Sequence, residues 1–271
     1  SQRGNICAAY RRLPLEPPAI DSLGLPDAVV NLLEHKKGLI LITGATGSGK
    51  STTMAALVNK LTKELPGHIL TIEDPIEYLY PHSKALINQR EIGIDSPSFS
   101  DALKSALRQD PDLVVIGELR DPESMATALT IAETGHLVLG TLHTNSAAGT
   151  ITRLIDAFPP EKQNIIRMNL SMCLIGVISQ QLIPNTKNSL SLALEILINT
   201  SAIKALIREN NIHQVNNYIK SGGKDGMILM DDSLSKLFND GVISRDSMIE
   251  YAIDSKAMNE SSASMPKQPN I

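Results

Sequence analysis

The feature that most constrains this chain is a glycine-rich loop between an apolar segment and a helix-forming segment. Residues 44–51 read Gly-Ala-Thr-Gly-Ser-Gly-Lys-Ser, a full match to the phosphate-binding pattern GxxxxGK[ST]. The apolar run at 39–43 before it is typical of a buried parallel strand, and residues 50–64 after it favour a helix. The pattern requires this order of strand, turn and helix, which indicates an α/β protein.

The residue types of this loop suit a triphosphate. Glycines leave backbone N–H groups free to surround phosphate oxygens, and the N-terminus of the next helix adds a positive dipole. Lys50 is predicted to reach the β- and γ-phosphates, and the Ser51 hydroxyl to bind Mg²⁺. We therefore expect ATP and Mg²⁺ as ligands, with these nucleotide contacts: Gly44, Ala45, Thr46, Gly47, Ser48, Gly49, Lys50, Ser51 and Thr52.

Strand-like and helix-like segments alternate along the rest of the first half of the chain. This alternation predicts a mostly parallel sheet with helices on both faces, followed by a small C-terminal α-helical subdomain. Further strands are expected at 68–72, 85–88, 113–116, 136–140 and 190–198. Further helices are expected at 98–108, 122–133, 147–156, 160–179, 200–210, 211–220, 231–239 and 244–253.

The same survey predicts four regions. Residues 1–20 are expected to be a linker and the remnant of an earlier domain, and 21–198 the α/β core. Residues 199–254 would form the helical subdomain. The polar stretch 255–271 contains two prolines and no apolar period, and a disordered tail is predicted there.

Acidic residues follow two of the predicted strands. Glu73, Asp74 and Glu77 come after the strand at 68–72, and Glu118 ends another. Because ligands of open α/β sheets bind beyond the carboxyl ends of the strands, these groups should face the phosphate site. A carboxylate there can orient or deprotonate a water, and we expect Glu73 and Asp74 to join Ser51 around Mg²⁺. The alternative, solvated loop acids, stays open.

Histidines and arginines give a weaker signal. His136 and His143 bracket a predicted strand that should neighbour the phosphate-binding strand, so His143 falls at its carboxyl end and could sense the γ-phosphate. A structural role for either histidine is equally open. An arginine often offsets charge on a transferring phosphoryl group. The sequence does not select one among Arg3, Arg11, Arg12, Arg90, Arg108, Arg120 and Arg153.

Composition bears on which classes of partner this chain can bind. A net charge of -4, with five Tyr, three Phe and no Trp, argues against a nucleic-acid partner, and none is expected. Cys7 and Cys173 form neither a CxxC pair nor a metal-binding spacing. No apolar run reaches the ~18 residues of a membrane-spanning helix, so a cytoplasmic protein is predicted.

An ordered set of segments over about residues 1–253 resembles the PilT-like family of secretion and pilus ATPases. Each segment resembles one family motif: GATGSGKSTT the Walker A loop, ILTIEDPIEY the Asp box, INQREIG with SFSDALKSALRQDPDLVVIGELRD the Walker B region, and AETGHLVLGTLHT the His box. The resemblance implies a RecA-like core in a homohexameric ring that hydrolyses ATP. The ring would work on an inner-membrane platform protein, from the cytoplasmic side.

The resemblance also implies roles for single residues. Glu118 would be the catalytic Walker B glutamate, with Gly117 at the position that holds aspartate in other P-loop proteins. Glu77 would be the catalytic or metal-linked acid of the Asp box, and His143 the His-box residue near the γ-phosphate. Residues 1–12 resemble the last strand of the family's N-terminal domain.

Two features bear on the subfamily. Residues 201–209 resemble the AIRNLIRE motif of pilus retraction ATPases, with Lys204 and Ala205 as departures, and the four-cysteine zinc site of assembly ATPases is missing from the sequence. Retraction of a type IV pilus is therefore the leading hypothesis. A secretion ATPase outside pili, a nucleic-acid translocase and a nucleotide-binding subunit with little activity remain alternatives.

Overall fold

A computed structural model describes residues 16–263, so most of the predicted remnant at 1–20 lies outside the described part. Its centre is a seven-stranded sheet in the order β3-β2-β4-β5-β1-β6-β7. Neighbouring strands are parallel except β6 and β7, which are antiparallel. The predicted α/β fold with a mostly parallel sheet is confirmed. The strands are β1 Gly38–Thr43, β2 His68–Glu73, β3 Leu86–Glu91, β4 Leu113–Ile116, β5 Leu137–Leu142, β6 Leu174–Pro184 and β7 Leu190–Ile198.

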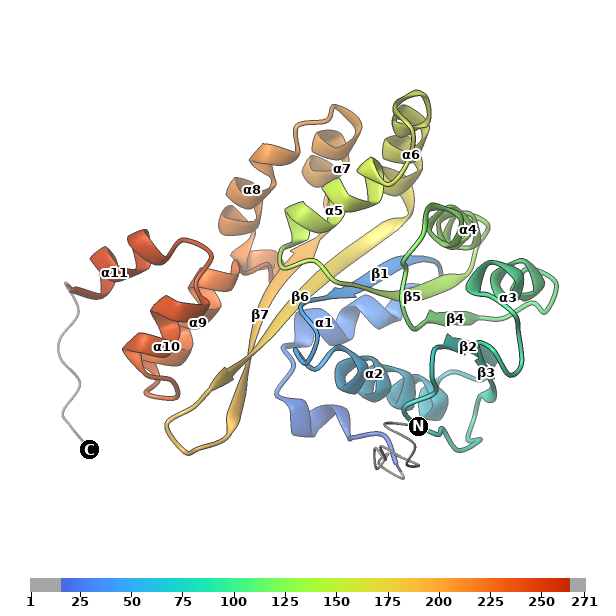
Figure 1. Ribbon diagram of the computed structural model, residues 1–271, viewed down its shortest axis with the longest axis horizontal. Coiled ribbons are helices and arrows are strands. Elements are labelled where there is room, and N and C mark those ends of the chain that lie inside the picture. The colour runs from blue at the N-terminus through green and yellow to red at the C-terminus, as the bar shows by residue number, and fades with distance from the viewer. Residues whose placement is uncertain (1–15, 264–271) are drawn as a thin grey trace, which may run out of the picture.

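Helices cover both faces of the sheet, and successive side chains of β1 point alternately to one face and the other. Leu39 and Leu41 pack in one core with α3–α8, whereas Ile40 and Ile42 pack in a second core with α1 and α2 (Figure 1). Among the described residues, no helix combines the length and apolarity of a membrane span. The α-helices are α1 Asp27–Asn31, α2 Lys50–Glu64, α3 Phe99–Ala106, α4 Pro122–Glu133, α5 Ala147–Asp156, α6 Pro160–Cys173, α7 Ser201–Arg208, α8 Val215–Ser221, α9 Met230–Asn239, α10 Arg245–Tyr251 and α11 Ser255–Ala263.

The strand order places the sequence motifs at one edge. β5 lies between β4 and β1, and β2 lies on the far side of β4, all in parallel. Their carboxyl ends therefore meet, and the four loops that follow these strands converge. The prediction that the strand before His143 neighbours the phosphate-binding strand is confirmed.

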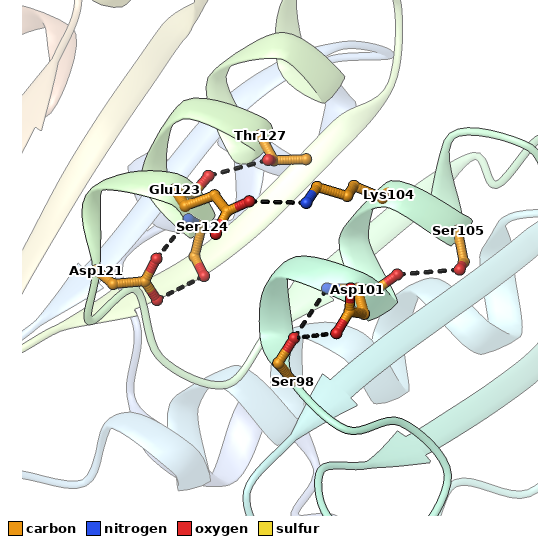
Figure 2. Close-up of polar contacts among 8 residues, drawn as sticks. All are labelled: Ser98, Asp101, Lys104, Ser105, Asp121, Glu123, Ser124 and Thr127. Carbon is orange, nitrogen blue, oxygen red and sulfur yellow. Dashed lines mark hydrogen bonds and ion pairs between the residues drawn. The ribbon is translucent and has the colours of Figure 1, made fainter.

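Side-chain caps fix the helices beside this edge. Ser98 accepts a hydrogen bond from the backbone N–H of Asp101 at the start of α3. Asp121 accepts bonds from the backbone N–H and the hydroxyl of Ser124 at the start of α4 (Figure 2). Such caps satisfy N–H groups that lack partners within the helix. Because Asp121 ends the loop that begins at Gly117, its cap fixes that loop at the helix.

The helix predicted at 160–179 is confirmed through Cys173 and wrong at 174–179. Residues 174–179 belong to β6, which pairs with β1 on one side and β7 on the other. Gly176 lets these strands approach closely, because a Cβ atom there would lie 2.8 Å from the carbonyl oxygen of Leu197. An apolar run without periodicity suits either structure, and the pairing with two strands decides it.

The tail predicted as disordered at 255–271 is also partly wrong. Residues 255–263 form α11, whose Met258 is buried in a cluster with α9 and α10. Asp254 accepts a hydrogen bond from the N–H of Ala257 and so caps the helix. Residues 264–271 lie outside the described part.

The helices after β7 divide between two clusters. α7 and α8 pack in the main core, through Ile203, Leu206 and Ile219 among others, whereas α9–α11 form a cluster of their own on the ends of β6 and β7. Helices therefore follow the last strand, as expected. The domain boundary at 198/199 stays a prediction.

Candidate functional site

The glycine-rich loop connects β1 to α2, as its pattern predicts. Gly44, Gly47 and Gly49 have φ angles of 146°, 81° and 88°, in the region that side chains disfavour. A Cβ atom on Gly44 would also lie 2.4 Å from the carbonyl oxygen of Gln180. Glycine is thus required both by backbone conformation and by the neighbouring strand.

Lys50 begins α2 and reaches back over the loop. Its Nζ donates hydrogen bonds to the carbonyl oxygens of Gly44 and Ala45, both at 2.8 Å, and the residue is 9% exposed. Burial lowers the pKa of Lys50, and the carboxylates of Glu118 and Glu77 act in the opposite direction. Two of the three ammonium N–H groups are therefore bonded to the loop itself.

Glu118 follows β4 and stands opposite the loop. One of its oxygens accepts a hydrogen bond from Nε of Arg120 at 2.8 Å, and the other lies 3.3 Å from Nε2 of His143. Nη1 of Arg120 also lies 3.5 Å from Asp74. The side chain of Glu118 is 21% exposed, so it can meet both these partners and a ligand. Three of the converging loops thus contribute to one charged cluster.

Loop and acidic cluster line one cleft with a volume of ≈ 600 Å³. Most of the predicted site residues line it: Thr46, Gly47, Gly49, Lys50, Ser51, Thr52, Glu73, Asp74, Glu77, Glu118 and His143. Gly44, Ala45 and Ser48 belong to the same loop but not to the lining: Gly44 packs on β6, the Ser48 side chain is buried, and Ala45 is exposed outside the cleft. His136 lies at the other end of β5.

Glu73 holds the acidic loop in place. Its carboxylate accepts hydrogen bonds from the hydroxyl of Thr71 at 2.7 Å, from Gln89 at 3.2 Å and from the backbone N–H of Glu77. Burial raises the pKa of Glu73, and these bonds oppose the rise. The bond to Glu77 orders the segment that carries Asp74 and Glu77 into the cleft.

The structure explains the glycine before Glu118. A Cβ atom on Gly117 would lie 3.3 Å from both the Cα of Glu73 and the carbonyl oxygen of Ile72. Thr141 of β5 donates a hydrogen bond to the carbonyl oxygen of Gly117 from the other side. Gly117 is therefore enclosed by its neighbours, and this close packing fixes the backbone from which Glu118 projects.

The structure distinguishes the candidate arginines by whether they line the cleft. Among those in the described residues, Arg120 alone lines the cleft. Arg90 donates instead to the side-chain oxygen of Gln109. Arg3, Arg11 and Arg12 lie outside the described residues.

Sequence reasoning missed Gln180. This β6 residue is 1% exposed, and its Nε2 donates a 2.7 Å hydrogen bond to the carbonyl oxygen of Ser48 in the loop. The same nitrogen packs beside Gly49, at 3.1 Å from the position that a Cβ atom would take. The sequence carried little signal for this role, because Gln180 stands in the polar run Ser179-Gln180-Gln181 and its strand was not predicted.

Replacing Gln180 by leucine is expected to loosen the loop. The carbonyl of Ser48 would lose its buried donor, at a cost of about 1–3 kcal/mol in the free energy of unfolding, and nucleotide affinity should fall with it. Urea denaturation and nucleotide titration measure the two effects. Gln181→Leu, next in the strand but on its other face, is the matched control. Equal effects of the two substitutions would contradict the role of Gln180.

Together, the parallel sheet, the glycine loop and the acidic cleft beyond the strand ends define a nucleotide-binding P-loop ATPase. The family described as "Type II/IV secretion system protein" matches residues 21–240. The chain belongs to this family, and the resemblance seen in the sequence motifs is confirmed.

Three relatives show how far the similarity extends. The chain is 47% identical over 252 residues to the "Type IV pilus retractation ATPase PilT" of Pseudomonas aeruginosa, covering 93% of this chain and 73% of that protein. It is 45% identical over 252 residues to the "Twitching motility protein" of Neisseria gonorrhoeae, covering 93% and 67%. A solved structure of the "Pilus Retraction Motor PilT and Bound ADP" superposes with a TM-score of 0.87 at 48% identity, covering 92% and 71%.

Proposed function

We propose that this chain hydrolyses ATP and couples hydrolysis to mechanical work in the retraction motor of a type IV pilus. The observation that carries the proposal is the single cleft in which Lys50 faces Glu118, with Glu77 and His143 in the same wall. A relative named for the type IV pilus, at 47% identity, and one named for twitching motility, at 45%, support this use of the site. A related secretion machine is the alternative assignment.

In the proposed reaction, the loop N–H groups and Lys50 bind the β- and γ-phosphates. Glu118 accepts a proton from a water that attacks the γ-phosphorus, and the bond to the β–γ bridging oxygen breaks to release ADP. We assign to His143 the sensing of the γ-phosphate, and its 3.3 Å contact with the Glu118 carboxylate supports this role. Glu77 is the second acid, and its charge acts on Lys50 from the same cleft.

The residues present fit a magnesium ion. Ser51, Glu73 and Asp74 line the cleft, and all three offer the oxygen ligands that Mg²⁺ prefers. Bound there together with the phosphates, the ion would neutralise phosphate charge. Ser51 is the best placed of the three because it is exposed at the start of α2, whereas Glu73 already accepts bonds from the sheet.

We also propose the assembly and partner. The chain would form a homohexameric ring that engages an inner-membrane platform protein from the cytoplasmic side, as the family resemblance implies. Residues 201–209, which resemble the retraction motif, lie on and just after α7, with one face buried in the main core and Ser201, Arg208 and Glu209 exposed. We assign to this segment the retraction-specific role, and no nucleic acid is required.

The test is phosphate release by the purified chain with Mg²⁺ and ATP, with and without DNA. We expect turnover that depends on Mg²⁺, does not rise with DNA, and accompanies ring assembly in light scattering. In cells without their own retraction ATPase, the gene should restore pilus retraction. DNA-stimulated turnover would support the translocase alternative instead, and a chain that binds ATP without hydrolysing it would contradict the motor.

A further inference from the structure

A buried carboxylate outside the nucleotide cleft connects two helices. Glu195 lies on β7 among apolar residues and is 1% exposed. One oxygen accepts a hydrogen bond from the N–H of Ala147 at 2.6 Å, and the other from the N–H of Met230 at 3.3 Å. Ala147 is the first residue of α5 and Met230 the first of α9, and both helices contact β7 (Figure 1).

Neither bond has a ready substitute. Ala147 and Met230 are both fully buried, so water cannot replace the carboxylate at their N–H groups. The N-cap residue of α9 is Leu229, whose side chain cannot accept a hydrogen bond, so Glu195 supplies the missing cap. Two helix N-termini, each carrying partial positive charge, thus meet at one carboxyl group. Burial raises the pKa of Glu195, and the bonds from the N–H groups of Ala147 and Met230 oppose the rise.

The α5 end of this connection leads to the nucleotide site. α5 starts just after the loop that carries His143. Thr150 in its first turns contacts the Thr144 hydroxyl at 2.6 Å and the Thr43 hydroxyl at 3.5 Å. Thr43 is the residue before the glycine loop, and its hydroxyl also bonds to Ser179 of β6 at 2.7 Å. Buried hydroxyl groups therefore join the start of α5 to both sides of the cleft.

The α9 end leads to the last three helices. Met230 and Leu234 of α9 are buried in the cluster shared with α10 and α11. The carboxylate of Asp231 accepts hydrogen bonds from the N–H groups of Ile253 and Asp254, which join α10 to α11. A displacement of the first turn of α9 is therefore shared by the whole group α9–α11.

We propose that Glu195 is a positioning residue that couples the nucleotide site to helices α9–α11. Its carboxylate holds α5, and with α5 the loop of His143, in a fixed relation to α9. The inference rests on the proposed function, because the signal to be passed on is the change at His143 when a nucleotide binds or is hydrolysed. The contacts form a continuous path, and the coupling of its two ends is what the experiment measures.

The experiment is hydrogen exchange of the whole chain with and without ADP, compared between the wild type and Glu195→Gln. In the wild type, ADP should change the exchange of first-turn amides in both α5 and α9, by about fivefold or more for coupling of ordinary size. Glutamine keeps the size but turns an NH₂ group toward one of the two N–H donors. We expect the response at α5 to remain and the response at α9 to be lost, with ADP affinity unchanged.

A matched control lies beside it. Ser233→Ala removes a 3.1 Å bond from the N–H of Leu194, which also joins α9 to β7 but caps no helix. This variant should keep the response at α9. A response at α9 that persists in Glu195→Gln, or that is absent from the wild type, overturns the proposal.

A second variant tests the same path in case Glu195→Gln does not fold. Thr150→Val breaks the path at its other end and leaves Glu195 intact, and we expect it to weaken the ADP response at α9 as well. An unchanged α9 response in this variant overturns the path through α5. The two proposals can fail independently. If the proposed function is wrong, the chain releases no phosphate from ATP, even though the exchange of α9 still responds to ADP.

Discussion

Lys50→Ala is expected to reduce ATP turnover by roughly 10²–10³-fold, the usual cost of removing one group that stabilises developing charge. The ammonium is the buried cation at the centre of the loop, and alanine leaves the phosphates without it. Its loss also removes the bonds that tie the start of α2 to Gly44 and Ala45. Steady-state phosphate release and ATP titration measure the two effects.

The chain offers a matched control on the same helix. Lys60 pairs with Glu64 at 2.6 Å on the surface of α2, so Lys60→Ala removes a lysine charge without touching the cleft. Exposed pairs of this kind contribute at most about 1 kcal/mol, and turnover should stay at the wild-type level. Wild-type turnover in Lys50→Ala would refute the phosphate-binding role of the loop.

Glu118→Gln is expected to lower kcat by roughly 10²–10⁴-fold, because the amide has the size of the carboxylate but cannot accept a proton. ATP binding should be retained, since a negative charge is removed from beside the triphosphate. The partner of His143 changes from a carboxylate to an amide, and the amide oxygen can still accept the bond from Arg120. Single-turnover kinetics with separate measurement of ATP affinity distinguish loss of chemistry from loss of binding.

Glu123→Gln is the control for charge. Glu123 lies five positions further along, in the first turn of α4, where it pairs with Lys104 at 2.7 Å on the surface (Figure 2). Its replacement also removes one carboxylate near this point of the sequence, but that carboxylate does not line the cleft. If the two glutamine variants reduce kcat equally, Glu118 is not the base.

The loop and Glu118 could be predicted because each is encoded locally. All phosphate-binding groups of the loop stand in consecutive positions, and the strand and helix around it are required by the pattern itself. Glu118 follows four apolar residues, and the end of a buried parallel strand has a defined place relative to the ligand. The structure places Glu118 opposite the loop, and its catalytic role stays a prediction.

Strand β6 could not be predicted in the same way. Residues 174–179 follow α6 as an apolar run without periodicity or a turn signal, and only the neighbours β1 and β7 determine that they are extended. Helix α11 was not predicted either, because packing against other helices stabilises it. Its sequence is polar, and the burial of Met258 against α9 and α10 stabilises it from a distance.

Glu195 was visible in the sequence, but its partners were not. It is a charged residue inside the apolar strand predicted at 190–198, a pattern that indicates a buried hydrogen bond. Gln180 was less visible, because it stands between Ser179 and Gln181 in a polar run. The partner of Gln180 is the carbonyl of Ser48, 132 positions away, and the first partner of Glu195 is the N–H of Ala147, 48 positions away. Only the folded sheet brings residues so far apart in the sequence into contact, so the roles of Gln180 and Glu195 were recognised in the structure.

The two carbonyl oxygens that hold Lys50 belong to the same loop that the lysine serves. Because Nζ donates to Gly44 and Ala45, the position of the ammonium group depends on the backbone path of these two residues. A substitution at Gly44 that changes this path would therefore move the positive charge as well. One defect in the loop would then weaken two contributions to phosphate binding together, the backbone N–H groups and the lysine charge.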